Sequence, residues 1–219
     1  MEGSAASAQV SGVRTGQFGG LTRSNDGLGG LNELSGARAE ARLAACCASR
    51  RWARAVAAMR PFTTIDALYE SASHELAALE WPDIREALDA HPRIGRRPAG
   101  GGTEAAWSRA EQAGVTSADA DAVATQAALN AAYEAKFGYI FLIRAAGRSA
   151  QQILDSVRDR LDHDEITEQA VVRGELRQIM RLRLDKMLAE LGEKSESAGQ
   201  SELSEQSEQA GEPGSGGPT

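Results

Sequence analysis

Alanine places the strongest constraint on the fold of this chain, because it fills 40 of the 219 positions and favours helices more than any other residue. No stretch alternates apolar and polar residues with the period of two that marks a strand. Four prolines, Pro61, Pro82, Pro92 and Pro98, fall where helical patterns stop. The sequence therefore predicts an all-α protein.

Apolar residues recur at helical spacing in several segments. Residues 64–79 form one such stripe, and the last long helix is expected from Asp164 to about Leu191. A helix is also expected from Ser117, a residue type that caps helix N-termini. It carries a face of small residues and a face of bulky ones, so we expect it to pack on two sides.

Glycine marks the ends of the folded part. Of the 23 glycines, nine lie in residues 1–36 and six in residues 192–219, where six glutamates accompany a single lysine. Such stretches have little apolar surface to bury. We expect a disordered tail over 1–28, one compact multi-helix domain over 29–192 and a disordered acidic tail over 193–219.

Charge and cysteine content exclude several classes of function. The net charge is −7, and most of it belongs to the ends, so neither nucleic acid nor an anionic membrane is an expected partner. No apolar run approaches the roughly 18 to 20 residues of a membrane span, and the expected compartment is the cytoplasm. Cys46 and Cys47 are adjacent, which is unsuited to a disulfide framework and typical of small buried residues.

Two segments interrupt the helices, and both are candidates to border a cavity. Residues 91–103 are rich in proline and glycine, and residues 137–149 are an apolar run that ends in Gly-Arg-Ser. His91 ends a helix and precedes Pro92, which restricts its backbone to extended conformations and aims its side chain consistently. A histidine favoured by the helix dipole is the alternative interpretation.

Three polar residues of the next helix, Ser108, Glu111 and Gln112, share one side, which is either a pocket wall or a solvated face. Arg144 interrupts an apolar run, and Arg148 lies in a glycine turn; each is either an anion-binding group or half of a structural ion pair. No histidine or cysteine grouping has metal-ligand spacing, and no nucleotide-binding or nucleophile-elbow motif occurs. We therefore expect neither a metal nor a cofactor.

Five sequence pieces taken together are similar to one enzyme family. They are RPFTT (60–64), HPRIG (91–95), SRAEQAG (108–114), LNAAYEAKFGYIFLIRAAGRS (129–149) and RLRL (181–184). In this order and spacing, from about Leu31 to Leu191, the chain resembles the 2-oxo-4-hydroxy-4-carboxy-5-ureidoimidazoline (OHCU) decarboxylases. The resemblance implies an all-α, usually homodimeric enzyme without a cofactor. Its implied reaction converts OHCU into (S)-allantoin and CO2, the last step from urate to allantoin.

The resemblance also implies residue roles. It makes His91, held by Pro92, the catalytic histidine and Glu111 its acidic partner, with Ser108 and Gln112 lining the same pocket, and it leaves Arg148 and Arg144 competing to grip the substrate. From this we hypothesise that His91, oriented by Glu111, moves the proton of the substrate hydroxyl. Two alternatives stay open: a non-catalytic helical interaction module, and a hydrolase of a related ureido compound.

Overall fold

A computed structural model describes residues 18–95, 102–113 and 120–209 of the chain. Helices account for all regular structure in these ranges, and none of them is long and apolar enough to cross a membrane. In chain order they are α1 (Phe18–Glu33), α2 (Gly36–Cys47), α3 (Arg50–Ala58), α4 (Ile65–Ala77), α5 (Trp81–Ala90), α6 (Thr103–Glu111), α7 (Ala120–Phe137), α8 (Ala150–Leu161) and α9 (Glu165–Gln209). The predicted all-α class is confirmed.

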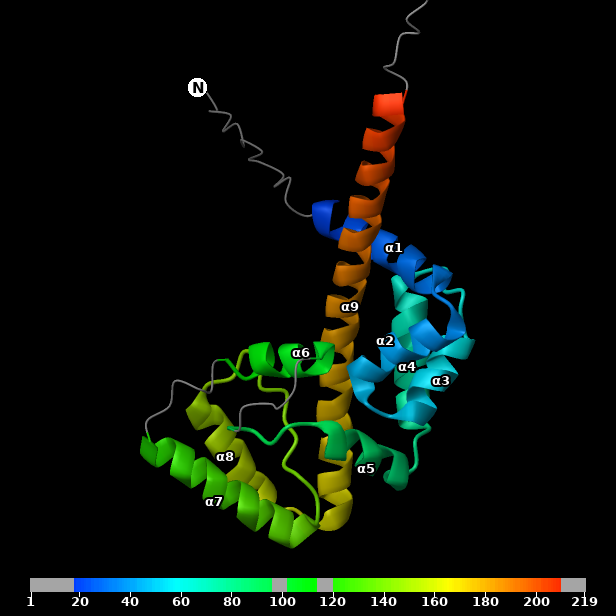
Figure 1. The fold of residues 1–219 in the computed structure, drawn as a ribbon. Coiled ribbons are helices and arrows are strands. Elements are labelled where there is room, and N and C mark those ends of the chain that lie inside the picture. The colour runs from blue at the N-terminus through cyan, green and yellow to red at the C-terminus, as the bar shows by residue number, and fades with distance from the viewer. Residues whose placement is uncertain (1–17, 96–101, 114–119, 210–219) are drawn as a thin grey trace, which may run out of the picture.

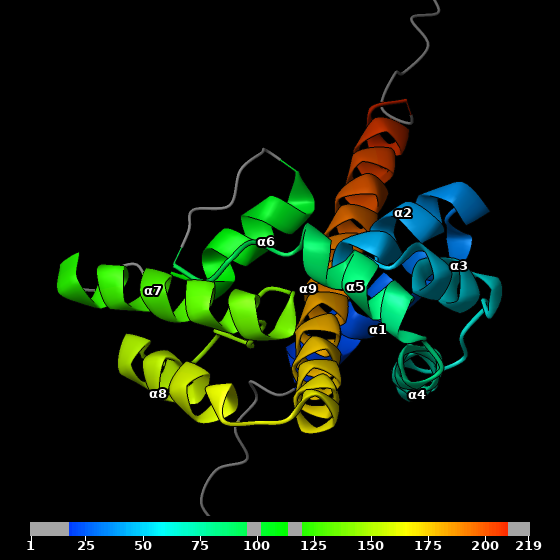
Figure 2. The ribbon, with the colours of Figure 1, turned by 90° about the horizontal axis from the view of Figure 1, so that it is seen from below.

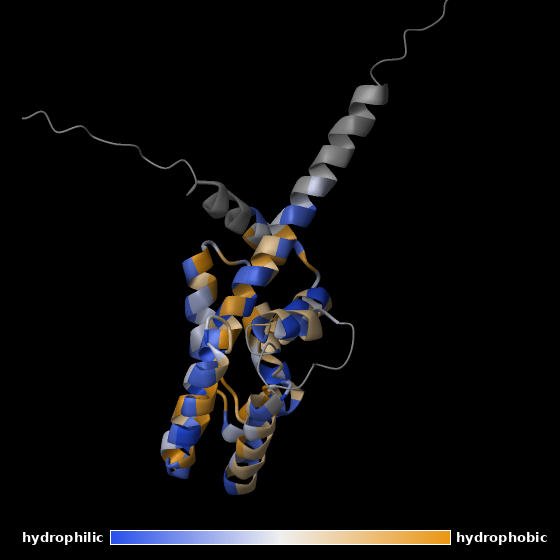
Figure 3. Ribbon diagram, turned by 90° about the vertical axis from the view of Figure 1, so that its left-hand side faces the viewer, coloured by the Kyte–Doolittle hydropathy of each residue, from blue (hydrophilic) through white to orange (hydrophobic). Residues whose placement is uncertain are grey.

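Helix α9 is the axis of the molecule. It runs between α2–α5 on one side and α6–α8 on the other, and this division is visible in two perpendicular views (Figures 1 and 2). Helix α1 packs along α9, and α2 contacts α9 as well. Hydrophobic and hydrophilic residues alternate around the helices (Figure 3), as expected where each helix turns one face inward.

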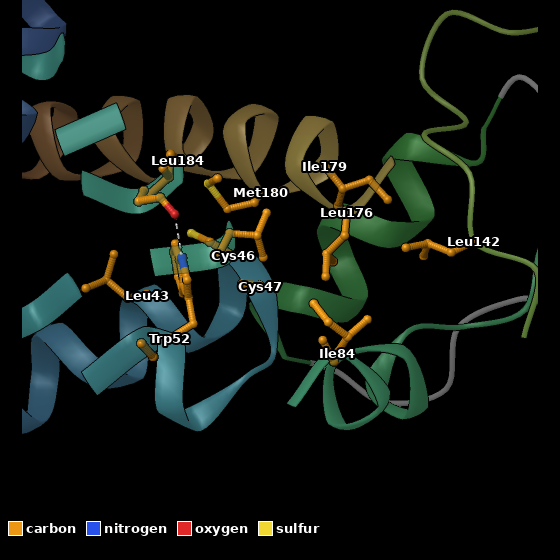
Figure 4. Close-up of a cluster of buried hydrophobic side chains, with 14 of the residues drawn as sticks. Leu43, Cys46, Cys47, Trp52, Ile84, Leu142, Leu176, Ile179, Met180 and Leu184 are labelled. Atoms are coloured by element: carbon orange, nitrogen blue, oxygen red, sulfur yellow. Dashed lines mark hydrogen bonds between the residues drawn. The ribbon is translucent and has the colours of Figure 1, made fainter. Parts of the chain in front are cut away.

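The core between α9 and the first helices is continuous and closely packed. Trp52 is fully buried, and its indole Nε1–H donates to the carbonyl oxygen of Ala72 at 2.9 Å, so its polar atom is satisfied inside the core. Cys46 and Cys47 are also fully buried and lie beside α9 (Figure 4). Burial raises the pKa of the Cys47 thiol to about 12, which keeps it protonated. Both cysteines are structural, as expected.

Helix α1 occupies residues that were expected to be a disordered tail. Leu28 and Leu31 are buried in the core, and the backbone of α1 approaches α9 closely at Gly27. A Cβ atom at Gly27 would lie 2.0 Å from the carbonyl oxygen of Leu188. Glycine is thus a packing residue here, where the absence of a side chain lets two helices touch.

Helix α9 also differs from the expectation, because it continues to Gln209 instead of ending near Leu191. A helix already nucleated by packing adds residues at little further cost, and Gly192 and Gly199, although poor helix formers, do not end it. The proposed domain limits, 29–192, stay a prediction. The expected cap Ser117 lies outside the described residues.

Candidate active site

His91 ends α5, and its backbone has the extended conformation that the following proline imposes. Its φ and ψ are −81° and 138°, outside the helical region, and its side chain turns back into the protein instead of continuing the helix surface. The residue is only 7% exposed. The prediction drawn from the His91–Pro92 pair is confirmed for the backbone.

The imidazole of His91 has one nitrogen bonded and one free. Nδ1 lies 2.6 Å from the carbonyl oxygen of Ala87, and since a carbonyl only accepts, Nδ1 carries the proton. Nε2 is then the unprotonated nitrogen, and it is buried without a hydrogen-bond partner among the described residues. Burial, helped by the charge of Arg183, lowers the His91 pKa to about 4, although Ala87 and Glu111 oppose the shift. His91 is a neutral base at physiological pH.

Helix α6 presents the predicted trio to the same place. Ser108 is 2% and Gln112 5% exposed, so this face is not solvated at these two residues, and both line a cavity with Glu111. The side-chain Oε1 of Gln112 accepts the backbone N–H of Gly95 at 3.2 Å. Gly95 has a φ of +80°, which glycine adopts without strain, so this bond ties the turn after His91 to α6.

Arg183 also belongs to this site, although the sequence analysis does not single it out. It comes from α9, is 1% exposed, and donates from Nη2 to Ser108 Oγ at 2.9 Å and to Glu111 Oε2 at 3.1 Å. It also donates from Nη1 to the carbonyl oxygen of Ala45 at 3.3 Å. The sequence does indicate a buried position for Arg183, because Arg183 follows Ile179 by four positions and so lies on the apolar stripe of its helix.

The carboxylate of Glu111 pairs with cations instead of with His91. Its two oxygens accept from Arg183 and from Lys186 Nζ, the latter at 3.0 Å, and the hydrogen bonds described include none to the imidazole. Among the hydrogen bonds described, the one that holds the imidazole is made with Ala87, and Glu111 acts on His91 through its charge. An orienting role for Glu111 stays a prediction. A second carboxylate, Glu104, lies 3.7 Å from Arg183, and its pKa is raised by burial.

These residues border a small cavity whose opposite wall is the segment 140–145, which has no regular secondary structure. The cavity measures about 20 Å³ and is lined by His91, Pro92, Ile94, Ser108, Glu111, Gln112, Phe141, Leu142, Ile143, Ala145, Ile179 and Arg183. An adjoining cavity of about 290 Å³ shares His91, Pro92 and Ser108 with it. Both interrupting segments of the sequence thus border the small cavity, as predicted, and the first also borders the larger one. Residues 96–101 of the first segment lie outside the described residues.

The two arginines of the second segment do not belong to either lining. Arg148 pairs through Nη2 with Glu175 Oε1 at 3.2 Å, and its side chain is 29% exposed. Arg144 uses its backbone N–H to bond Glu175 Oε2 at 2.7 Å. The structure favours the ion-pair interpretation for Arg148, and a substrate grip by either arginine stays a prediction.

The remaining histidines lie away from this site. His74 is exposed, and His163 contacts the buried Glu168 through Nδ1 at 2.8 Å. Within the described residues, no cluster of three or more His, Cys, Asp or Glu side chains has an arrangement that would hold a metal ion.

A family model described as OHCU decarboxylase matches residues 32–185, which is well over half of the chain and includes His91, Ser108, Glu111, Gln112 and Arg183. The chain belongs to the OHCU decarboxylase family. The resemblance drawn from its motifs is therefore confirmed.

Relatives and solved structures agree with membership of the OHCU decarboxylase family. A mouse protein named 2-oxo-4-hydroxy-4-carboxy-5-ureidoimidazoline decarboxylase is 32% identical over 67% of this chain and 82% of its own length. The uric acid degradation bifunctional protein TTL of Arabidopsis thaliana is 30% identical to this chain over 66% of the chain. The match covers only 46% of the length of that relative. An OHCU decarboxylase crystallised in the presence of (S)-allantoin superposes with a TM-score of 0.58, at 28% identity, over 67% of this chain and 96% of the other.

Proposed function

We propose that this protein decarboxylates OHCU to (S)-allantoin and CO2 without a cofactor, the last step from urate to allantoin. Within a family so named, the proposal rests on one observation: the unprotonated Nε2 of His91 is buried and unpartnered beside a cavity lined by polar groups. A buried polar atom without a partner is uncommon in a stable fold and is expected where a ligand completes the hydrogen bond.

The chemistry of the substrate explains why no cofactor is needed. When the carboxylate leaves as CO2, its bonding electrons stay on the ring carbon and must be delocalised. The adjacent unsaturated group of OHCU accepts them, so the substrate is its own electron sink. The protein has to orient the carboxylate, exclude water and move protons.

His91 is suited to the proton transfers. As a neutral imidazole it accepts the proton of the substrate hydroxyl at Nε2, and the anionic substrate, by its charge, raises the His91 pKa from its value in the free protein. The imidazolium so formed then donates to one face of the enol-like intermediate. A donor fixed in position by Ala87 delivers that proton from one side only, which gives (S)-allantoin in place of a racemate.

Arg183 is our candidate for the cation that meets the substrate carboxylate. It lines the cavity with His91, whereas Arg144 and Arg148 do not. Ser108 and Gln112 border the same space and offer a hydroxyl and an amide for polar contacts with the substrate ring. We favour Arg183 for this role because it lines the cavity, and Arg148 and Arg144 stay the alternatives.

The small cavity alone has room for about one water molecule, so the substrate needs the adjoining space as well. The larger cavity, of about 290 Å³, approaches the size of small-ligand pockets, and its boundary includes His91, Pro92 and Ser108. We propose that the substrate spans both cavities, with its reacting end at His91 and Arg183 in the small one and the rest of the molecule in the larger one.

The decisive experiment generates OHCU fresh from urate with the two preceding enzymes, adds the protein and follows circular dichroism and CO2. We expect rapid release of CO2 and formation of (S)-allantoin, against slow formation of racemic product without the protein. An open-chain product without CO2 would identify a ureido hydrolase, and the absence of any acceleration would identify an interaction module. The same assay is applied to His91→Asn. Its matched control is His74→Asn, because His74 is exposed and lines neither cavity.

The family resemblance also implies a homodimer, which light scattering on the purified protein tests. The two free, buried thiols are in keeping with a reducing compartment such as the cytoplasm.

A further inference from the structure

One wall of the cavity has no helix or sheet to hold it. Residues 140–145 have no regular secondary structure, yet five of the six are buried. Phe141, Leu142, Ile143 and Ala145 line the cavity at His91. Because a buried irregular segment lacks a regular ladder of backbone bonds, its position depends on the side chains that reach it.

Glu175 of α9 is one of those side chains. It is 8% exposed, and its Oε2 accepts the backbone N–H of Arg144 at 2.7 Å, between two residues that line the cavity. Its Oε1 accepts from Arg148 at 3.2 Å. A single carboxylate of α9 thus bonds the wall segment directly and bonds the arginine that follows it.

A second anchor lies two helical turns earlier on α9, on the same side. Glu168 is fully buried and accepts from Arg160 Nε at 2.9 Å. Arg160 in turn donates from Nη1 to the carbonyl oxygen of Leu142 at 2.8 Å, and its guanidinium lies 4.5 Å from the centre of the Phe141 ring. The wall is therefore bonded at Leu142 by Arg160 of α8, which Glu168 of α9 holds, and at Arg144 by Glu175 of α9.

We propose that Glu175 is a positioning residue for the reaction: it sets the backbone of the cavity wall, and Arg148 acts through Glu175 and not on the substrate. Burying charged groups seldom adds net stability over apolar side chains of similar size, which favours a role in geometry. The catalytic part of this inference rests on the proposed function, whereas the structural part does not.

Amide hydrogen exchange tests the structural part without any substrate. Glu175→Ala removes the acceptor of the Arg144 N–H, so peptides covering 139–148 should exchange at least about tenfold faster than in the unmodified protein. Glu175→Gln keeps an acceptor oxygen and should restore most of the protection. Glu193→Ala, an exposed carboxylate on the same helix, is the control. Unchanged exchange in Glu175→Ala would overturn the inference.

Steady-state kinetics with fresh OHCU test the catalytic part, using enough protein to outrun spontaneous decay. We expect Glu175→Ala to raise KM and lower kcat, with kcat/KM falling on the order of 10- to 100-fold, and Glu175→Gln to be intermediate. A purely structural role would lower the melting temperature or the folded fraction and leave the KM of the folded protein unchanged. Glu193→Ala should behave as the unmodified protein.

A double-mutant cycle separates the two roles of Arg148. If Arg148 acts through Glu175, Arg148→Gln should reduce kcat/KM in the unmodified protein and have little further effect in Glu175→Ala. Arg158→Gln, on the exposed face of α8, is the control. An undiminished effect of Arg148→Gln in the Glu175→Ala background would mean that Arg148 grips the substrate, which overturns the inference. If the unmodified protein does not turn over OHCU, the proposed function falls together with the catalytic part, and exchange alone decides the structural part.

Discussion

Nδ1 of His91 donates to the carbonyl oxygen of Ala87, four residues earlier in the chain, at 2.6 Å. This bond fixes both the tautomer and the ring orientation, and it leaves Nε2 unprotonated at the cavity. A backbone carbonyl thus holds the imidazole, while the orienting role that the family resemblance implies for Glu111 stays a prediction.

His91→Asn should remove turnover while the protein stays folded. The amide nitrogen of asparagine can still donate toward Ala87, but no base remains at the position of Nε2. We expect kcat to fall by about 10²- to 10⁴-fold, as measured by circular dichroism of the allantoin product. Activity above about a tenth of the original would show that another group moves the proton.

Stability should depend on pH through His91. Its pKa is 6.5 when unfolded and about 4 in the fold, so the unfolded chain binds the proton more readily. Neutral His91 therefore makes its full contribution to the free energy of unfolding above pH 6.5, and this contribution is lost as the pH falls from 6.5 toward 4. Urea unfolding of the unmodified protein and of His91→Asn at several pH values isolates the contribution of His91 to the free energy of unfolding. Parallel curves for the two proteins would contradict the buried, neutral imidazole.

Arg183→Lys should impair catalysis more than the same change at Arg144 or Arg148. Lysine keeps the charge but cannot contact Ser108, Glu111 and Ala45 at once, so kcat/KM should fall at least about tenfold. Arg177→Lys, exposed on the same helix, is the matched control. If Arg148→Lys proved the most damaging in kinetics with a normal melting curve, the substrate grip would belong to Arg148.

Glu111→Gln should be nearly as harmful to turnover as Glu111→Ala. The carboxylate balances Arg183 and Lys186, and either substitution leaves those cations without their shared anion. If Glu111 instead oriented the imidazole by a hydrogen bond, glutamine would preserve much of the activity. Comparing kcat for the two variants distinguishes charge from orientation.

Gly27→Ala should destabilise the fold, although it adds a single methyl group far from the site in sequence. That methyl would lie 2.0 Å from the backbone oxygen of Leu188, so α1 has to move away from α9, at a cost of about 1–3 kcal/mol in the free energy of unfolding. Gly29→Ala meets nothing within 4 Å and should leave the urea midpoint unchanged or raise it. Equal behaviour of the two variants would argue against the close helix contact.

Much of the site could be predicted from short-range patterns. The extended backbone of His91 follows from the next residue, Pro92, and the common side of Ser108, Glu111 and Gln112 follows from helical spacing. The ends of the domain were harder to predict, because composition does not distinguish glycine in a tail from glycine at a helix contact. Gly27 belongs to the second kind.

The sequence by itself determined the helical class, the two segments that border the cavities and the polar residues on either side of them, since each depends on neighbours within about one helical turn. The tertiary structure decided which charges meet. Arg183 and Glu111 are 72 positions apart, and Arg148 and Glu175 are 27 apart. No local pattern specifies such pairs, because partners on different helices are brought together only when α9 packs between the two halves of the molecule.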